Sequence, residues 1–164
     1  GNGKVLPAGP LRESVSSGLA RADLLLTIGD TQAQSQFTDT WRAELGIPRA
    51  IAQLIPLETG MDWVGQRMLA FAGIGHPEKF FGTLRELGAD LVRAQPLSDH
   101  QELTDTLLKR LEIEAAALSA QLVTTEKDAV RLPKSFQQKV LTLPVRLELS
   151  DAQALDVALK RIGL

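Results

Sequence analysis

The sequence predicts an α/β protein: a three-layer, Rossmann-like domain with a mainly parallel sheet of about five strands. Short apolar runs alternate with segments of helical periodicity through most of the chain, and glycine or polar clusters end the apolar runs. A composition of 44% hydrophobic and 23% charged residues is typical of a globular domain. Because alternating strands and helices pack best as parallel strands covered on both faces, the pattern favours this fold class.

In the first part of the chain, residues 23–28 form an apolar run that predicts a buried strand. A helix is expected next, since apolar residues recur at every fourth position and Gly46 and Pro48 then stop the pattern. Residues 50–66 alternate weakly and contain a turn, which indicates an extended linker or hinge pair. The apolar positions of the expected helix are Phe37, Trp41 and Leu45.

The second part of the chain shows a clearer series of strands and helices. Strands are expected at 68–72, 90–94, 122–125 and 140–149, the last interrupted by Pro144. Pro77 suits the first position of a helix, and residues 103–118 have the period of a long amphipathic helix. A final helix is expected after Ser150 and Gln153, which stand at capping-box spacing.

This pattern predicts a Rossmann-like domain at 23–164, preceded by a loop and a short helix at 1–22. Gly1–Lys4 is loop-like and does not begin with Met, so we expect the chain to be a piece of a longer protein. The net charge is −2, and the 18 basic residues are scattered, which disfavours nucleic acid as a partner. With no cysteine and two histidines, the sequence predicts no metal site.

Four blocks stand out in order: Pro7–Glu13 (PAGPLRE), Phe71–Phe81 (FAGIGHPEKFF), Pro96–Gln101 (PLSDHQ) and Leu122–Pro133 (LVTTEKDAVRLP). Together they resemble the C-terminal half of the lipid A 4′-kinases (tetraacyldisaccharide 4′-kinases), over nearly the whole chain. These bacterial enzymes transfer the γ-phosphoryl group of ATP to a lipid A precursor. The family's phosphate-binding loop precedes the first block and is not part of this sequence.

The resemblance implies an acceptor-side domain of an ATP-dependent kinase that phosphorylates the 4′-hydroxyl of the tetraacyldisaccharide 1-phosphate. ATP and Mg²⁺ would be bound mainly by an N-terminal P-loop half, so this chain alone is expected to be inactive and without a cofactor. Its partners would be the lipid A precursor and that N-terminal half. The resemblance also implies peripheral contact with the cytoplasmic face of the inner membrane of a Gram-negative bacterium, although the chain itself has no membrane span.

Arg12 and Glu13 end the first block, which the prolines and Gly9 shape into an extended approach. Arginine can bind a phosphate in a forked geometry, and glutamate can accept hydrogen bonds from sugar hydroxyls. The same two residues also fit an exposed charge pair at the start of a helix. The resemblance favours a substrate-binding role, at the phosphorylated head group of the disaccharide.

His100 follows Asp99 just beyond an expected strand. A histidine oriented by a neighbouring carboxylate can help to deprotonate a hydroxyl. By itself the segment favours a surface histidine in a first helical turn capped by Ser98 and Gln101. The resemblance assigns His100 to the catalytic apparatus, while the family's catalytic aspartate belongs to the other half. Asp99, the neighbour of His100, is a candidate for substrate binding.

Gly73 and Gly75 lie between a strand and a helix, where backbone amides favour an anion. A tight turn that needs glycine for steric reasons fits equally, so they are candidates for a turn in the binding cleft. The polar residues 124–128 fit either a ligand contact or a turn cap. Two alternative functions remain open: a stand-alone Rossmann-like nucleotide-binding module and a non-catalytic interaction domain.

Overall fold

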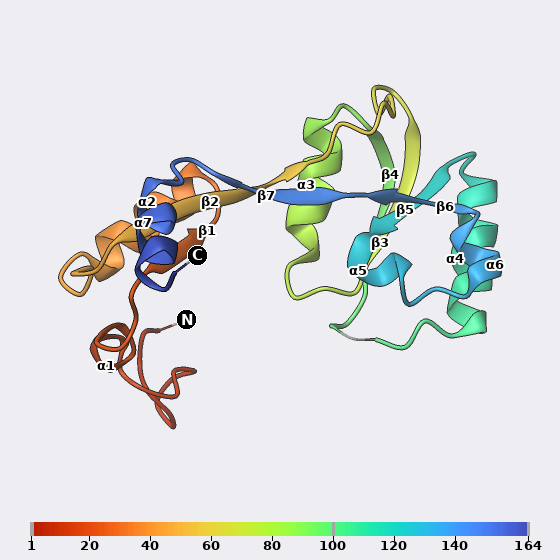
Figure 1. Ribbon diagram of the computed structural model, residues 1–164. Coiled ribbons are helices and arrows are strands. Elements are labelled where there is room, and N and C mark those ends of the chain that lie inside the picture. The colour runs from red at the N-terminus through yellow and green to blue at the C-terminus, as the bar shows by residue number, and fades with distance from the viewer. Residues whose placement is uncertain (1, 100, 164) are drawn as a thin grey trace. The chain divides into compact units, whose positions relative to one another are not determined.

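The computed structural model describes residues 2–99 and 101–163, and these form two compact units (Figure 1). Unit 1 contains the residues up to Ile55 and those from Arg146 onward; unit 2 is the continuous segment Pro56–Val145. The chain therefore passes between the units twice, and the first passage falls inside the 50–66 segment. The division at residues 1–22 and 23–164 stays a prediction, and it differs from this grouping.

Unit 2 is built on a four-stranded sheet in the order β4-β3-β5-β6. All three neighbouring pairs are parallel. The strands are β3 (Arg67–Ala72), β4 (Asp90–Pro96), β5 (Gln121–Thr125) and β6 (Val140–Leu143). β3 is the most enclosed strand, since every residue after Arg67 is buried, which explains its uninterrupted apolar sequence.

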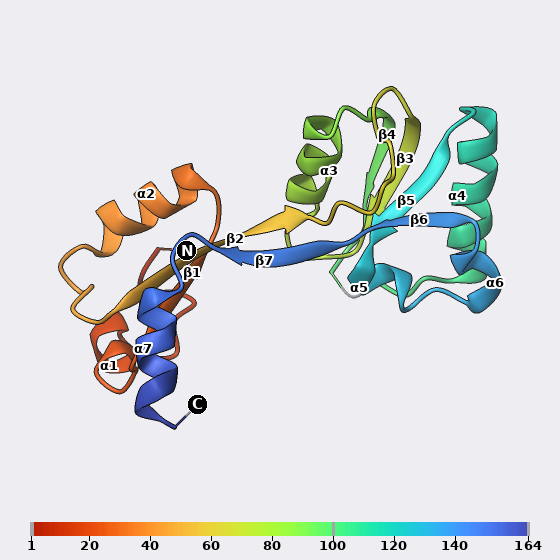
Figure 2. The same cartoon turned by 45° about the horizontal axis from the view of Figure 1, so that its top comes forward.

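Helices cover both faces of this sheet. Met68, Ala70 and Ala72 pack with residues of α3 (Pro77–Glu86), whereas Leu69 and Phe71 pack with residues of α4 (Asp105–Ala117). Successive side chains of a strand point to opposite faces, and Figures 1 and 2 show α3 and α4 on opposite sides of the sheet. Two short helices, α5 (Glu126–Ala129) and α6 (Lys134–Gln137), complete the unit. The α/β, three-layer, Rossmann-like fold class is confirmed.

Unit 1 contains a separate three-stranded sheet in the order β1-β2-β7. β1 and β2 are parallel. Ser150 N–H donates to the Ile51 carbonyl and Leu57 N–H to the Pro144 carbonyl, each at 2.9 Å, so the chain segments around β2 and β7 run antiparallel. The strands are β1 (Leu25–Ile28), β2 (Arg49–Pro56) and β7 (Val145–Leu149), and the helices are α1 (Val15–Leu19), α2 (Thr31–Trp41) and α7 (Gln153–Arg161).

Arg49 is the centre of a half-buried polar network in unit 1. Its guanidinium donates to Thr27 Oγ1 at 3.0 Å and Thr38 Oγ1 at 2.6 Å, and also to Gln34. It lies 5.1 Å from the centroid of the Phe37 ring, a cation–π distance. In unit 1, polar contacts therefore join α2 to the sheet. In unit 2, the helices α3 and α4 pack on the sheet through apolar side chains.

The structure corrects three details of the sequence-based description. The seven strands found in the described residues are divided between two sheets, and the 140–149 segment splits at Pro144 into β6 and β7, one in each sheet. The helix after Gly29 ends at Trp41 and does not include Leu45. The capping box at Ser150 is wrong: the N-cap of α7 is Ala152, because the Ser150 amide still bonds to Ile51 at the end of the sheet.

Candidate functional site

The strand order places a topological switch point in unit 2 between β3 and β5. β4 lies on one side of β3 and β5 on the other, so the loops after these strands diverge at the carboxyl edge of the sheet. Open α/β sheets bind ligands outside such a point. The β3 loop carries Gly73 and Gly75, the β4 loop carries Asp99, and the segment after β5 carries Asp128.

Asp128 is fully buried and connects these loops. Its Oδ2 accepts from the Gly73 N–H at 2.9 Å and from Thr125 Oγ1 at 2.9 Å. Arg131 donates to Oδ1 at 3.1 Å through Nη1, and its Nη2 donates to the backbone carbonyl of Gln101. One carboxylate thus joins the β3 loop to the start of α5 and, through Arg131, to the β4 loop.

Gly73 is closely packed. A Cβ at this position would lie 3.3 Å from Asp128 Oδ1, a tight contact, and 3.4 Å from the Ser98 carbonyl oxygen, which is close to ordinary van der Waals contact. Its amide, the group expected to face an anion, donates to Asp128. Gly75 is exposed, and a Cβ there would meet nothing within 4 Å. At Gly73 the protein's own carboxylate takes the place of a bound anion.

The segment around Asp99 forms a turn closed at both ends. Gln101 N–H donates to the Ser98 carbonyl at 2.9 Å, and Ser98 N–H donates to Gln101 Oε1 at 3.0 Å. Asp99 is exposed and forms an ion pair with Lys127 at 3.7 Å. His100 itself lies outside the described residues. The interpretation of Ser98 and Gln101 as a helix cap is wrong, because α4 begins only at Asp105, with Thr104 as its N-cap.

The Pro7–Glu13 block in unit 1 forms a loop closed on itself. Leu6 N–H donates to the Leu11 carbonyl at 2.8 Å, and Leu11 N–H donates back to the Lys4 carbonyl at 3.1 Å. Gly9 is essential here, since a Cβ would overlap the Lys4 carbonyl group. The loop precedes α1, whose N-cap is Ser14.

Arg12 and Glu13 differ in their surroundings although both are exposed. Arg21 binds Glu13 through both guanidinium Nη atoms, one of them 2.6 Å from Glu13 Oε2. The hydrogen bond from Arg21 lowers the pKa of the Glu13 carboxyl below 4.5, so Glu13 is ionised near neutrality. Within the described part of the chain, Arg12 makes no hydrogen bond or ion pair, which leaves its guanidinium available to a ligand.

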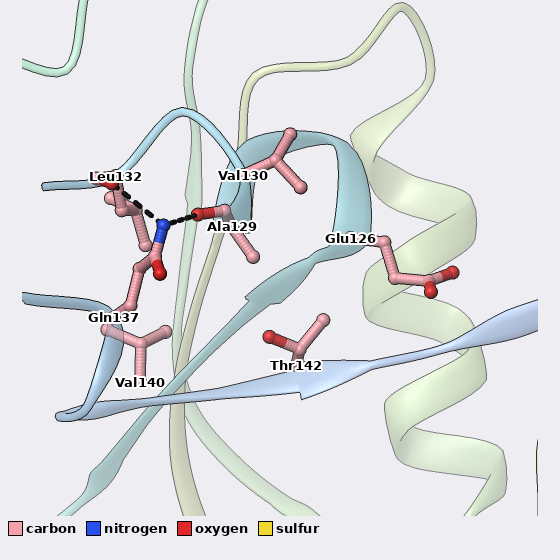
Figure 3. Close-up of a pocket in the computed structure, with 7 residues that line it drawn as sticks. All are labelled: Glu126, Ala129, Val130, Leu132, Gln137, Val140 and Thr142. Carbon is pink, nitrogen blue, oxygen red and sulfur yellow. Dashed lines mark hydrogen bonds between the residues drawn. The ribbon is translucent and has the colours of Figure 1, made fainter. Parts of the chain in front are cut away.

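A separate cavity of about 290 Å³ lies beside β6 and the two short helices (Figure 3). Gln137 closes one side by donating to the Ala129 carbonyl at 3.1 Å and to the Leu132 carbonyl at 2.9 Å, while Glu126 lies on the other side. None of the predicted site residues contributes to it. The lining residues are Glu126, Ala129, Val130, Leu132, Gln137, Val140 and Thr142.

Among residues 2–99 and 101–163, no three acidic or histidine side chains gather into a group that could hold a metal ion. No helix in the same residues is long and apolar enough to span a membrane. The Gly73 N–H already donates to Asp128, so it is not an open hydrogen-bond donor for a nucleotide phosphate.

Sequence reasoning left the role of the Thr124–Asp128 segment open and missed Asp128 and Arg131. The available signal was a spacing: Thr125 and Asp128 stand three residues apart, as in a capping box. Thr125 is indeed the N-cap of α5, and its Oγ1 accepts from the Asp128 N–H at 3.2 Å. What the spacing could not show is the long-range bond from Asp128 to Gly73.

Several known proteins are similar to this chain. The family model described as LpxK, tetraacyldisaccharide-1-P 4′-kinase, matches residues 1–163. A tetraacyldisaccharide 4′-kinase of Jannaschia sp. (strain CCS1) is 55% identical over 99% of this chain and 49% of its own length. The corresponding protein of Dinoroseobacter shibae is 58% identical over 97% of this chain and 48% of its own length.

A solved structure agrees with the fold. The crystal structure of an "apo" form of LpxK from Aquifex aeolicus in complex with ATP matches 98% of this chain and 49% of that protein, with a TM-score of 0.61 and 21% identity. The chain spans about half the length of the curated relatives that it matches. Since the family model matches almost every residue, the chain belongs to the tetraacyldisaccharide-1-P 4′-kinase family.

Proposed function

We propose that this chain is the acceptor-side part of a kinase that phosphorylates the 4′-hydroxyl of a tetraacyldisaccharide 1-phosphate lipid A precursor. The match of the family model to residues 1–163 is the observation that supports it most strongly. ATP and Mg²⁺ would be held mainly by residues of an N-terminal P-loop half. When bound there, the metal and nucleotide supply the phosphoryl group and neutralise its charge.

Arg12 is proposed to bind the phosphate of the acceptor. Its guanidinium is exposed and has no protein partner among the described residues, and it follows a loop shaped by backbone hydrogen bonds. An arginine can donate two parallel hydrogen bonds to a phosphate. Glu13 would accept a sugar hydroxyl through lone pairs that Arg21 does not use, since an ionised carboxylate has about four acceptor sites.

His100 is proposed as the catalytic residue of this chain and Asp99 as a substrate-binding neighbour. A neutral imidazole can take up or orient the proton of the 4′-hydroxyl during transfer. The turn carrying Asp99 lies at the carboxyl edge of a parallel sheet, where this class of fold places its ligands. The peripheral contact with the cytoplasmic face of the inner membrane follows from the lipid nature of the substrate.

The test uses the full-length kinase and its lipid acceptor. His100→Ala should lower kcat about 10- to 1000-fold, the lower range of a positioned acid–base group, with the melting temperature nearly unchanged. The low-pH limb of the rate profile should also change, since a neutral imidazole is required. His76→Ala is the matched control, because His76 is exposed and makes no side-chain cap bond at α3. Normal kcat in the His100 variant would refute its catalytic role.

The acceptor subsite has its own test. Arg12→Ala should raise KM for the lipid or lower kcat/KM, while KM for ATP stays as in the unsubstituted enzyme. Arg42→Ala provides the control, since Arg42 is also an exposed arginine but is paired with Asp39. Unchanged lipid kinetics in Arg12→Ala would remove Arg12 from the subsite.

The two alternatives, a nucleotide-binding module and a non-catalytic interaction domain, predict different results. Titration of the 164-residue chain with Mg-ATP should give no micromolar binding, since the Gly73 amide is already bonded and the sequence has no phosphate loop. Micromolar affinity would favour the nucleotide-binding module. An interaction domain predicts that neither the His100 nor the Arg12 variant changes turnover.

A further inference from the structure

The Thr124–Asp128 block contains a buried carboxylate for which the proposed reaction has no direct use. Asp128 is 0% exposed, yet it carries no substrate contact in the proposal above. Buried carboxylates are rare unless they are paired, and removing one partner of such a pair is costly. A polar group maintained at this position therefore needs an explanation.

All the bonds of this carboxylate go to residues at the carboxyl edge of the sheet. The Gly73 amide comes from the β3 loop and Thr125 from the end of β5. Among the described residues no buried side-chain polar atom lacks a hydrogen bond, so the cluster is fully satisfied. Such a network is rigid, because displacing any member leaves another buried group unpaired.

Arg131 extends this network to the turn that leads to His100. Its Nη1 is fixed by Asp128, and its Nη2 donates to the carbonyl of Gln101, the residue that follows His100 in the chain. On the other side of the turn, Lys127 pairs with Asp99, the residue that precedes His100. Side chains of the short segment after β5 therefore contact both neighbours of His100, and the Arg131 bond to the Gln101 carbonyl is the closer of the two.

We infer that Asp128 and Arg131 are positioning residues that fix the Ser98–Gln101 turn for catalysis. The inference rests on the proposed role of His100. Asp128 orients the guanidinium of Arg131, and Arg131 orients the turn through the Gln101 carbonyl. A catalytic group displaced by about 1 Å can lose roughly 100-fold in rate, so a fixed turn has a direct kinetic benefit.

Arg131→Lys in the full-length kinase separates this role from a purely structural one. A lysine keeps the charge beside Asp128, but a single ammonium group cannot reproduce the planar fork that spans two acceptors. We expect kcat to fall about 10- to 100-fold, KM for ATP to stay the same, and amide hydrogen exchange to accelerate in residues 97–104. The amides of β3 and β5 should keep their protection.

Arg67→Lys is the matched control. Arg67 also bridges an aspartate and a backbone carbonyl, since it donates to Asp90 at 3.4 Å and to the Leu118 carbonyl at 3.0 Å. It lies at the beginning of β3, whereas Asp128 and Arg131 follow the end of β5. The same substitution there should leave kcat unchanged.

A double-mutant cycle with His100→Ala tests whether the loss of kcat in Arg131→Lys acts through His100. If Arg131 acts through His100, Arg131→Lys should cause no further loss of kcat in the His100→Ala enzyme. Additive losses, an unchanged kcat in Arg131→Lys, or lost protection throughout β3 and β5 would each overturn the inference while leaving the role of His100 intact. A His100→Ala enzyme with normal kcat would instead overturn the proposed function, and this inference with it.

Discussion

The two units differ in how much apolar surface they bury. Of the buried apolar side chains in the described residues, Ala50 and Ala52 alone belong to unit 1, while all the others, including Met68, Phe71 and Phe81, belong to unit 2. Unit 1 leaves Leu26, Ile28 and Leu54 exposed by 43%, 54% and 60%. Since apolar burial is the main favourable contribution to folding, stability should be concentrated in unit 2.

The comparison also separates the proposed roles. Arg12 and Glu13 belong to the unit with a polar, weakly buried interior, whereas Asp99 and the Asp128 network belong to the unit with a complete core. A group that assists proton transfer needs fixed geometry. A group that binds a charged head group through an exposed arginine tolerates more movement. Substitutions in each unit can show whether the two units differ in this way.

The largest effect should come from the core of unit 2. Phe71 is 0% exposed, on the face of β3 that packs against α4. Phe71→Ala should therefore destabilise this unit by about 3–5 kcal/mol through lost apolar burial and the cavity that it leaves. Denaturant unfolding of the chain measures the change. Ile113→Ala on the exposed face of α4, where Ile113 is 70% exposed, should stay within about 0.5 kcal/mol. Equal losses of stability in Phe71→Ala and Ile113→Ala would contradict the conclusion that burial of apolar side chains stabilises unit 2.

A smaller, more local effect is expected from the polar network of unit 1. Arg49→Met removes three side-chain partners of the guanidinium and should cost about 1.5–3 kcal/mol. Hydrogen exchange should accelerate in β1, β2 and α2 and remain slow in β3 and β5. If the amides of β3 lose protection from hydrogen exchange to the same extent, the two units unfold together. Stability is then not concentrated in unit 2.

Two threonines offer a direct contrast between the sheets. Thr124 Oγ1, fully buried in unit 2, donates to the Phe71 carbonyl at 2.7 Å, while Thr27 Oγ1 in unit 1 lies 3.4 Å from the Ala50 carbonyl. Thr124→Val should therefore cost about 1–2 kcal/mol. Thr27→Val should cost less, since Arg49 keeps its other partners. If thermal unfolding shows a larger loss of stability for Thr27→Val than for Thr124→Val, the sheet of unit 1 is the more sensitive to loss of a threonine hydroxyl.

The smallest effect concerns the exposed pair of Glu13 and Arg21. Because Arg21 lowers the pKa of Glu13 in the folded chain, the pair contributes stability above pH 4.5, and this contribution is lost as pH falls through the lowered pKa. Arg21→Gln should raise the Glu13 pKa toward 4.5, as seen by NMR titration of the carboxyl carbon. The difference in melting temperature between variant and parent should shrink at low pH. A Glu13 pKa unaffected by Arg21→Gln would exclude the pairing.

The fold class and most elements were predictable because they depend on local pattern. β3 and α3 follow directly from an apolar run and from a proline at the first helical position. The division into two sheets was not predictable, since Leu25–Ile28 and Leu122–Thr125 are similar short strands by composition. Which sheet a strand joins is decided by long-range pairing, and local periodicity carries no information about it.

Recognition of the candidate site also had a physical limit. Arg12 and Asp99 could be selected because their blocks resemble those of a family. Asp128 looked like one more polar residue in an exposed segment, because its burial depends on Gly73, 55 positions away. Nothing in the spacing of a sequence distinguishes a solvated carboxylate from one enclosed by a distant loop.

The double passage of the chain between the units has a consequence for biosynthesis. β2 is complete once Pro56 is made, but its sheet neighbour β7 begins only at Val145, the last residue of unit 2. At about 5–20 residues per second, this interval lasts on the order of 10 s on the ribosome. Unit 2 contains all strands of its own sheet in one uninterrupted stretch, so it can fold during that time. The order of translation therefore favours a folded unit 2 before the sheet of unit 1 is complete.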